Sequence, residues 1–256
     1  MCTLALYFRV IKDFPLLVAA NRDEHYDRPS AAPHLWSAQP RVLAGKDLLA
    51  GGTWLGVNEH GLLVGILNRR SNGETDATLR SRARSRGLLC LDLLRVKSAA
   101  AACAFIKQHE QTYQPFTVVF VDPSEAWIAH NGRSKIATRK LGAGLHVYSS
   151  AADYSVRSEK LDRARLQFSG IVDGLPSKCS DKAAWVCGLH TVLGDHRTGN
   201  GSADPRDAIC VHGDVSGTVS STIIFYSQPE RRFCTFNAPG PPCRESFGEA
   251  QQLNVR

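Results

Sequence analysis

The residue with the clearest chemical potential is Cys2, which directly follows the initiator methionine. Cysteine is small, so we expect Met1 to be removed, and Cys2 then carries both a thiol and a free α-amine. The α-amine has a reference pKa of about 8, so much of it is neutral at cellular pH and can accept the thiol proton. One residue would then supply both nucleophile and general base. The simpler alternative is that Cys2 is a small apolar residue at the start of a strand.

A second group of reactive side chains follows a strand-like run in residues 17–30, "LVAANRDEHYDRPS". If residues 3–10 and 16–21 form a hairpin, Arg22 and Asp23 lie close to Cys2. A guanidinium there would lower the thiol pKa, and a carboxylate would hold the α-amine. The alternative is a surface cluster of salt bridges at a strand end. Within this group we expect Asn21, Glu24 and His25 to contact a ligand.

The net charge of +7 is concentrated in residues 69–86, "RRSNGETDATLRSRARSR". This segment has almost no large apolar residue, which favours a solvated surface loop. The alternative is that this segment is a clamp for an anionic small molecule that carries phosphate, carboxylate or propionate groups, with Arg69 and Arg70 among the residues that bind it. No aromatic residues are interleaved with the arginines and no recognition motif occurs elsewhere, so we expect no nucleic-acid partner.

The candidate metal ligands lie in residues 187–212 and are Cys187, His190, His196, Cys210 and His212. None of these residues has the spacing of a zinc finger. We therefore expect core cysteines and hydrogen-bonded histidines, and no metal site. The eight cysteines are scattered without a CxxC pair, so they do not predict a disulfide framework.

The elements that must position these residues alternate irregularly between strand-like and helix-like patterns. Strands are expected at 3–10, 16–20, 51–68 (a pair turning at 58–61), 116–122, 125–131, 144–150, 208–213, 218–227 and 231–237. Helices are expected at 86–109, with a break near 97–98, and at 154–173 and 180–193. This order lacks regular βαβ alternation. It predicts an α+β fold of mainly antiparallel sheets with helices packed on their outer faces.

The chain ends carry further expectations. Arg9, Lys12 and Asp13 interrupt the N-terminal apolar run, and no run approaches the roughly 20 residues that span a bilayer. We therefore expect a cytoplasmic protein with no transmembrane segment. Residues 1–240 are expected to form a single domain, and the Pro- and Gly-rich residues 241–256 a loosely attached tail.

Several motifs together resemble a known family. They are "MC", "LVAANRDEHYDRPS", "LAGKDLLAGGTWLGVNEHGLLVGILN", "RSRGLL" and "GTVSSTII". The sequence is similar to the NRDE-motif family, also called the transport-and-Golgi-organisation family. The resemblance implies the fold of N-terminal-nucleophile hydrolases, nearest to the penicillin V acylase and bile salt hydrolase group. That fold is a four-layer αββα sandwich.

The resemblance also implies roles for individual residues. Cys2 matches the nucleophile, and Asp23 matches the aspartate that binds the α-amine. Arg22 falls near the arginine beside the thiol, and Asn68 matches an asparagine of the oxyanion hole, whose N–H would stabilise a tetrahedral intermediate. The chain departs from the pattern at two positions: Ser150 stands where relatives have asparagine, and Val219 where they commonly have arginine.

Two classes of function remain open from the sequence. In the first, the protein is a cysteine-dependent amidase that acts on non-peptide C–N bonds and needs no cofactor. In the second, the same pocket serves a non-catalytic carrier or chaperone of haem or an acyl or lipid-type anion. Homo-oligomerisation is compatible with both.

Overall fold

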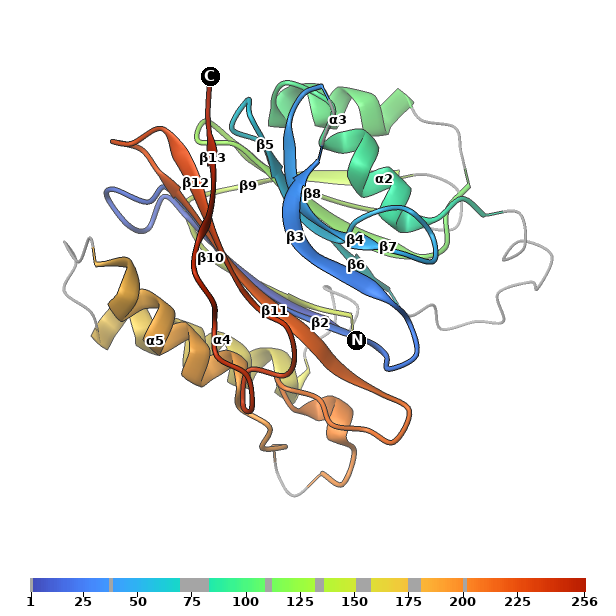
Figure 1. Ribbon diagram of the computed structural model, residues 1–256, viewed down its shortest axis with the longest axis vertical. Coiled ribbons are helices and arrows are strands. Elements are labelled where there is room, and N and C mark those ends of the chain that lie inside the picture. The colour runs from blue at the N-terminus through green and yellow to red at the C-terminus, as the bar shows by residue number, and fades with distance from the viewer. Residues whose placement is uncertain are drawn as a thin grey trace. The chain divides into compact units, whose positions relative to one another are not determined.

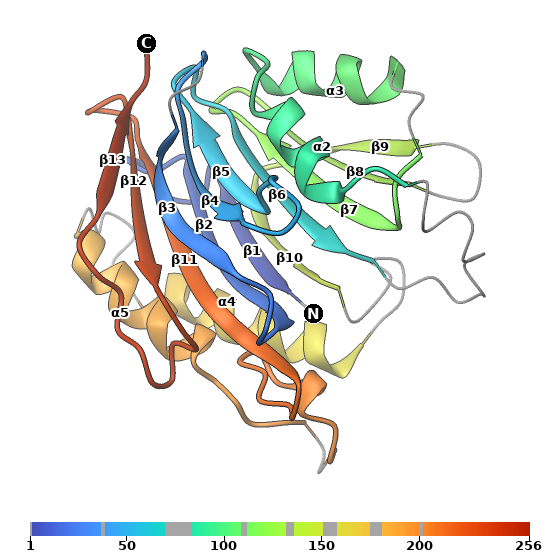
Figure 2. The same ribbon diagram turned by 45° about the vertical axis from the view of Figure 1, so that its right-hand side comes forward.

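The computed structural model describes residues 2–36, 39–69, 83–108, 112–131, 136–150, 158–174, 181–199 and 202–256 (Figures 1 and 2). The chain forms two compact units. The first consists of Met1–Asp27 and Ala143–Gln252, and the second of Arg28–Gly142 and Leu253–Arg256. The expectation that residues 1–240 form a single domain stays a prediction.

The first unit is built on a six-stranded sheet with the order β10-β1-β2-β11-β12-β13. β10, β1, β2, β11 and β12 pair antiparallel with their neighbours in that order. Its elements are β1 (Thr3–Phe8), β2 (Leu16–His25), β10 (Gly144–Ser149), α4 (Glu159–Gly174), α5 (Lys182–Leu193), the short 3-10 helix η1 (Pro205–Asp207), β11 (Ser216–Ser227), β12 (Arg232–Ala238) and β13 (Gln251–Asn254).

Helices α4 and α5 cover one face of this sheet (Figure 2). Alternate strand residues such as Ala5 and Tyr7 of β1 point toward them, as the two-residue period of a strand requires. The Tyr7 hydroxyl donates a hydrogen bond of 2.8 Å to the carbonyl of Phe168, and its ring meets Trp185 edge-on at 6.0 Å. This core fixes β1, the strand that follows Cys2.

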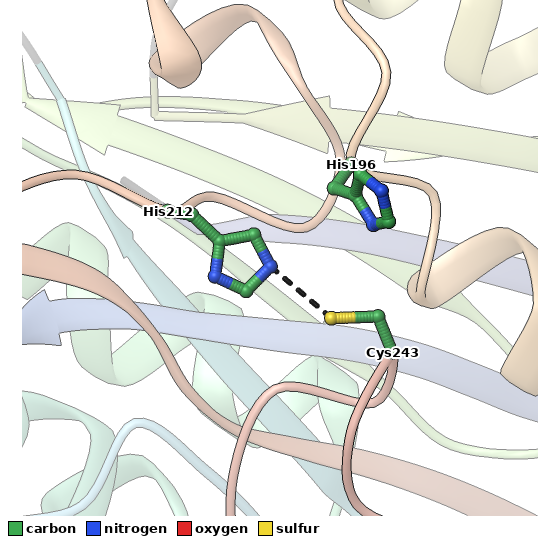
Figure 3. A group of neighbouring side chains, drawn as sticks. All are labelled: His196, His212 and Cys243. Atoms are coloured by element: carbon green, nitrogen blue, oxygen red, sulfur yellow. Dashed lines mark hydrogen bonds between the residues drawn. The ribbon is translucent and has the colours of Figure 1, made fainter.

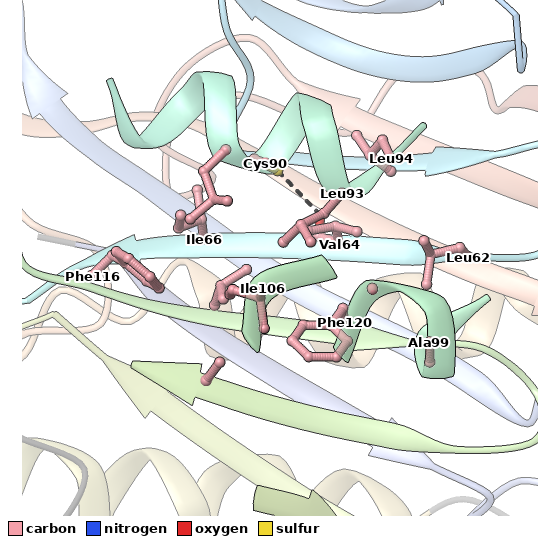
Figure 4. Close-up of a cluster of buried hydrophobic side chains, with 14 of the residues drawn as sticks. Leu62, Val64, Ile66, Cys90, Leu93, Leu94, Ala99, Ile106, Phe116 and Phe120 are labelled. Carbon is pink, nitrogen blue, oxygen red and sulfur yellow. Dashed lines mark hydrogen bonds between the residues drawn. The ribbon is translucent and has the colours of Figure 1, made fainter. Parts of the chain in front are cut away.

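The second unit is a seven-stranded antiparallel meander, β3 to β9 in chain order. Its elements are β3 (Ser30–Trp36), β4 (Val42–Asp47), β5 (Leu55–Asn58), β6 (Leu63–Asn68), α2 (Arg86–Leu93), α3 (Ala99–Gln108), β7 (Phe116–Val121), β8 (Ala126–Asn131) and β9 (Ile136–Leu141). Residues of α2 and α3 pack with alternate residues of β6 and β7, including Val64 and Phe120, in one apolar cluster (Figure 4).

The expected break between the two helices of the second unit is confirmed. Ser98 caps α3 by accepting a hydrogen bond of 3.1 Å from the backbone N–H of Ala101. The Asp122 carboxylate accepts a second one, of 2.8 Å, from the N–H of Ala99. The two groups satisfy backbone donors that a helix start leaves unpaired.

Most of the expected strands and helices are confirmed, and the exceptions have physical causes. The strand expected at 208–213 is wrong, because this stretch makes only an isolated bridge between His212 and Gly217. β3, β4 and β9 were not predicted; β3 and β9 lie at sheet edges and are largely exposed, so they lack a clear apolar alternation. The expected tail contains strand β13, in which Leu253 is buried.

Among the described residues, no helix combines the length and apolar character needed to cross a membrane.

The two mainly antiparallel sheets and the helices that pack on them make the fold class α+β, as the sequence predicts.

Replacing Asn58 by alanine should destabilise the protein. The buried Asn58 amide donates to the carbonyls of Leu94 and Val96, at 2.9 and 2.8 Å, and accepts from the N–H groups of His60 and Leu62, each at 3.0 Å. Asn58→Ala leaves these groups unpaired and should lower the free energy of unfolding by about 2–4 kcal/mol, measured by urea denaturation. The exposed Asn254→Ala is the control; equal effects of the two substitutions would contradict this account.

Candidate functional site

Strand pairing in the first unit determines where Cys2 lies. Thr3 pairs with Ser149 on one side and with Asn21 on the other. The residue before Thr3 therefore lies between the ends of β10 and β2, next to Ser150 and Arg22. The hairpin expected from the sequence is confirmed, and it brings the thiol to the charged group that ends β2.

Ser150 holds the backbone of Cys2 from the β10 side. Its Oγ accepts a hydrogen bond of 2.5 Å from the backbone nitrogen of Cys2. The N–H of Ser150 donates to the Cys2 carbonyl at 3.0 Å. Ser150 is itself buried, so these bonds fix the position of the nitrogen that becomes the α-amine once Met1 is removed.

Arg22 and Asp23 approach Cys2 from the β2 side and are both buried, with exposures of 5% and 3%. The Cys2 Sγ lies 3.9 Å from the backbone carbonyl oxygen of Asp23. In the pairing of β2 with β11, Asp23 faces Thr218 and Arg22 faces Ser220. Val219, the residue that replaces the family's arginine, is thus the extra residue at an irregularity of the ladder.

The Asp23 carboxylate is held by a hydrogen-bond chain. The Thr218 hydroxyl donates to Asp23 Oδ1 at 2.7 Å and accepts from the N–H of Val211 at 2.9 Å. Burial raises the pKa of Asp23, whereas the positive charges of the N-terminal amine and of Lys160 and the Thr218 hydrogen bond oppose that rise. The carboxylate is therefore desolvated but has three groups nearby that favour its charged form.

Lys160 of α4 is a buried lysine, 4% exposed, and its Nζ donates to the carbonyl of Arg206 at 3.0 Å. Burial lowers the pKa of Lys160, while the charges of Asp23 and Cys2 raise it. Lys160 is not among the residues predicted from the sequence. A signal was available, because Lys160 shares one helical face with the buried Ala164 and Phe168.

The thiol itself is not strongly activated in the chain that retains Met1. Burial raises the pKa of Cys2 above its ordinary value of 9.0, and the charge of Asp23 adds to the rise. The positive charge of the N-terminal amine, the backbone hydrogen bond to Asp23 and the charge of Arg22 act on the pKa in the opposite direction. The expected effect of a guanidinium on the thiol is present, but desolvation exceeds it.

Asn21 has a positioning role, which differs from the ligand contact expected for it. Its buried amide donates to the carbonyls of Leu193 and Ile209 at 2.9 and 3.0 Å. Its oxygen accepts from the Ser221 hydroxyl at 2.8 Å. These bonds connect β2 to β11 and to the chain that follows α5, and they occupy the amide.

The remaining predicted residues that the structure describes are each placed within their own unit. Glu24 is half-buried and accepts from the N–H of His25, which is exposed. Asn68 ends β6 in the second unit, so its expected part in an oxyanion hole stays a prediction. Arg69, also in the second unit, donates to the carbonyl of Asn131 at 2.9 Å. Arg70 lies outside the described residues.

The described arginines of the basic segment hold the second unit together. Arg84 binds the carboxylate of Asp92 and donates to the Tyr113 hydroxyl at 3.1 Å. Arg86 donates to the carbonyl of Pro115 at 3.1 Å. Residues 70–82 lie outside the described part, so the clamp hypothesis stays a prediction, but these bonds within the protein do not favour it.

A family model described as "Transport and Golgi organisation 2" matches residues 1–236. The chain belongs to this family. The bovine Transport and Golgi organization protein 2 homolog is 38% identical over 84 residues, which is 32% of this chain and 29% of that protein. The human homolog is 41% identical over 58 residues, 22% of this chain and 21% of that protein. The matched part of the chain thus spans less than a third of each relative.

Solved structures of amide hydrolases share the fold of this family member. Penicillin V acylase from Agrobacterium tumefaciens superposes with a TM-score of 0.60 at 15% identity, over 94% of this chain and 84% of that chain. The C2A mutant of conjugated bile acid hydrolase from Clostridium perfringens gives 0.61 at 10% identity, over 99% and 92%. An N-acylethanolamine-hydrolyzing acid amidase ortholog from Caenorhabditis elegans gives 0.54 at 14% identity, over 87% and 92%. The expected fold of N-terminal-nucleophile hydrolases is confirmed.

Replacing Thr218 by valine should weaken the support of Asp23. Thr218→Val removes the hydroxyl between Asp23 and Val211, so the free energy of unfolding should fall by about 1–3 kcal/mol at neutral pH. Because that hydrogen bond lowers the pKa of Asp23, the variant's folded state binds the Asp23 proton more tightly. The deficit should therefore shrink as the pH falls through the folded-state pKa of Asp23. Urea denaturation at several pH values, with the half-exposed Thr138→Val as control, tests this; a deficit that does not depend on pH would contradict it.

Proposed function

We propose that the protein is an N-terminal cysteine hydrolase of non-peptide amide bonds, with Cys2 as nucleophile after removal of Met1. The observation that carries the proposal is the contact between the Cys2 nitrogen and Ser150 Oγ beside the buried Asp23. Ser150, which follows β10, thereby binds the nitrogen that must become the general base, and the backbone carbonyl of Asp23 in β2 lies 3.9 Å from the sulfur of the same residue. The fold shared with three amide hydrolases supports the same conclusion.

The proposed reaction has two steps. The neutral α-amine of Cys2 takes the thiol proton, and the thiolate sulfur attacks the carbonyl carbon of the substrate. The C–N bond then breaks, and the amine leaves with the proton that the α-amine returns. Water, activated by the same α-amine, hydrolyses the resulting thioester, releases the acid and restores the thiol.

The surrounding residues would act on the α-amine rather than on the substrate. Ser150 Oγ accepts from the nitrogen, and the Asp23 carboxylate stabilises the ammonium form that appears during each step. Lys160 would help to keep Asp23 ionised, because its positive charge lowers the pKa of that carboxyl group. Ser150 therefore supplies an acceptor at the position where relatives have asparagine.

An assay with amide substrates distinguishes a hydrolase from a non-catalytic carrier protein. The chain beginning at Cys2 is incubated with N-acyl amino acids and N-acylethanolamines, and amine release and acyl adducts on Cys2 are measured by mass spectrometry. Cys2→Ala should reduce the rate by roughly a thousandfold or more, since the nucleophile itself is lost. The exposed Cys187→Ala should leave the rate unchanged. Ligand binding by Cys2→Ala, with no amine release by the parent chain, would contradict hydrolysis and favour the carrier alternative, in which haem or an acyl anion is the ligand.

Removal of Met1 should change the pH at which the alkylation rate of Cys2 rises. In the chain that retains Met1, burial raises the thiol pKa, so the alkylation rate should still increase above pH 9. In a chain cut to begin at Cys2, the adjacent α-ammonium should bring the inflection to lower pH. Peptide-resolved mass spectrometry measures Cys2 separately from the other cysteines. The same inflection in both chains would contradict the proposal, because it would show that placing the amine on Cys2 itself does not lower the thiol pKa further.

A further inference from the structure

Four side chains that bind soft metals converge in the first unit, outside the site of Cys2. His196 follows α5, Cys210 and His212 follow η1, and Cys243 follows β12. One ligand atom from each of His196, His212 and Cys243 lies within 4.8 Å of the others (Figure 3). Cys210 Sγ lies 3.6 Å from His212 Nε2 and 3.7 Å from Cys243 Sγ.

Two of these separations, both from Cys210, agree with tetrahedral coordination. With Zn–S of about 2.3 Å and Zn–N of about 2.0–2.1 Å, a tetrahedral ion sets two sulfurs about 3.8 Å apart, and sulfur and nitrogen about 3.5 Å apart. The distance between the Cys210 and Cys243 sulfurs and that from Cys210 to His212 differ from these values by only about 0.1 Å. His212 Nε2 and Cys243 Sγ are closer, at 3.1 Å, because they share a hydrogen bond. Small side-chain rotations would therefore complete the geometry.

The backbone segments that carry the four residues are held against one another. The N–H of Cys210 donates to the carbonyl of Asp195 at 2.9 Å, next to His196. His190 Nε2 lies 2.6 Å from the carbonyl oxygen of Pro242, next to Cys243. Any side chain at Gly194 would begin 3.2 Å from the Cys243 nitrogen, so glycine permits this close approach. The ligand atoms thus lie on positioned segments rather than on free loops.

The burial and charge of the cluster suit a thiophilic divalent cation. Cys210 is buried, His212 and Cys243 are half-buried, and His196 is exposed, so an ion can enter from the side of His196. Two thiolates neutralise the charge of a divalent ion.

We propose that His196, Cys210, His212 and Cys243 form a structural zinc site, or a site for another ion that prefers two sulfurs and two imidazole nitrogens. Binding forms two Zn–S and two Zn–N bonds and releases the two thiol protons to water. No metal was expected from the sequence, because the cysteines and histidines of residues 187–212 lack zinc-finger spacing; Cys243, which completes the set, lies in the segment expected to be a tail.

The zinc site would also support the site of Cys2. Val211 lies between Cys210 and His212, and its N–H binds the Thr218 hydroxyl that holds Asp23. The Val211 carbonyl in turn accepts from the N–H of Thr218 at 2.8 Å. An ion that fixes residues 210 and 212 would thus fix the partner of Asp23.

The test measures zinc in the full-length protein. The protein is purified in a reducing buffer without chelators, its zinc content is determined by elemental mass spectrometry, and Co²⁺ is then exchanged into the zinc-free protein. We expect one zinc per chain, and a cobalt spectrum with thiolate charge-transfer and intense tetrahedral bands. Cys243→Ser and His212→Ala should weaken Zn²⁺ binding by more than the roughly 10–100-fold that loss of a supporting residue causes. Cys187→Ser and His34→Ala are matched controls elsewhere on the surface.

A second measurement keeps the test decisive if a variant does not fold. In the unaltered protein, one equivalent of Zn²⁺ should slow alkylation of Cys210 and Cys243 while leaving that of Cys187 unchanged. Absence of zinc binding by the reduced protein would overturn the proposal. So would a disulfide between Cys210 and Cys243 whose reduction does not produce zinc binding, or equal binding by Cys243→Ser and its control.

Discussion

The pairing of β1 between β10 and β2 is the constraint on which the site depends. A chain end has little reason to be ordered, because few contacts usually hold it. Here the hydrogen bonds of β1 with both neighbours carry Cys2 to a fixed place, and Ser150 binds its nitrogen directly. The buried contact of Tyr7 with α4 holds the same strand from the opposite end. The pairing of β1 with its two neighbours therefore also places Cys2 in the site.

Buried charge is the second requirement of the site. Asp23 gives up hydration, and the Thr218 hydroxyl, which donates to it, and the charges of Lys160 and of the N-terminal amine offset part of that cost. Thr218 depends in turn on the segment that carries Cys210 and His212. A metal ion at that segment would act on the geometry of Asp23 without touching a substrate. A hydrogen-bond chain through Val211, Thr218 and Asp23 thus links the segment that carries the proposed metal ligands to the site of Cys2.

The sequence predicted the parts of the site that neighbouring strands bring together. Cys2, Arg22 and Asp23 could be placed because an apolar hairpin has a readable register, and the break before Ser98 could be placed because a cap has a local signal. Lys160, Thr218 and Cys243 could not be placed in the same way. Their partners are distant in sequence, and their positions depend on packing of α4, on a ladder irregularity and on a segment without regular structure.

The central claim is that Ser150 and Asp23 together hold the nitrogen of a terminal Cys2. A crystal structure of the chain that begins at Cys2 tests it most directly. The account predicts that the amine nitrogen lies within hydrogen-bond distance of Ser150 Oγ and of the Asp23 carboxylate, with the sulfur on the solvent side. An amine turned toward solvent, with Ser150 and Asp23 bonded elsewhere, would contradict it, wherever the sulfur lies.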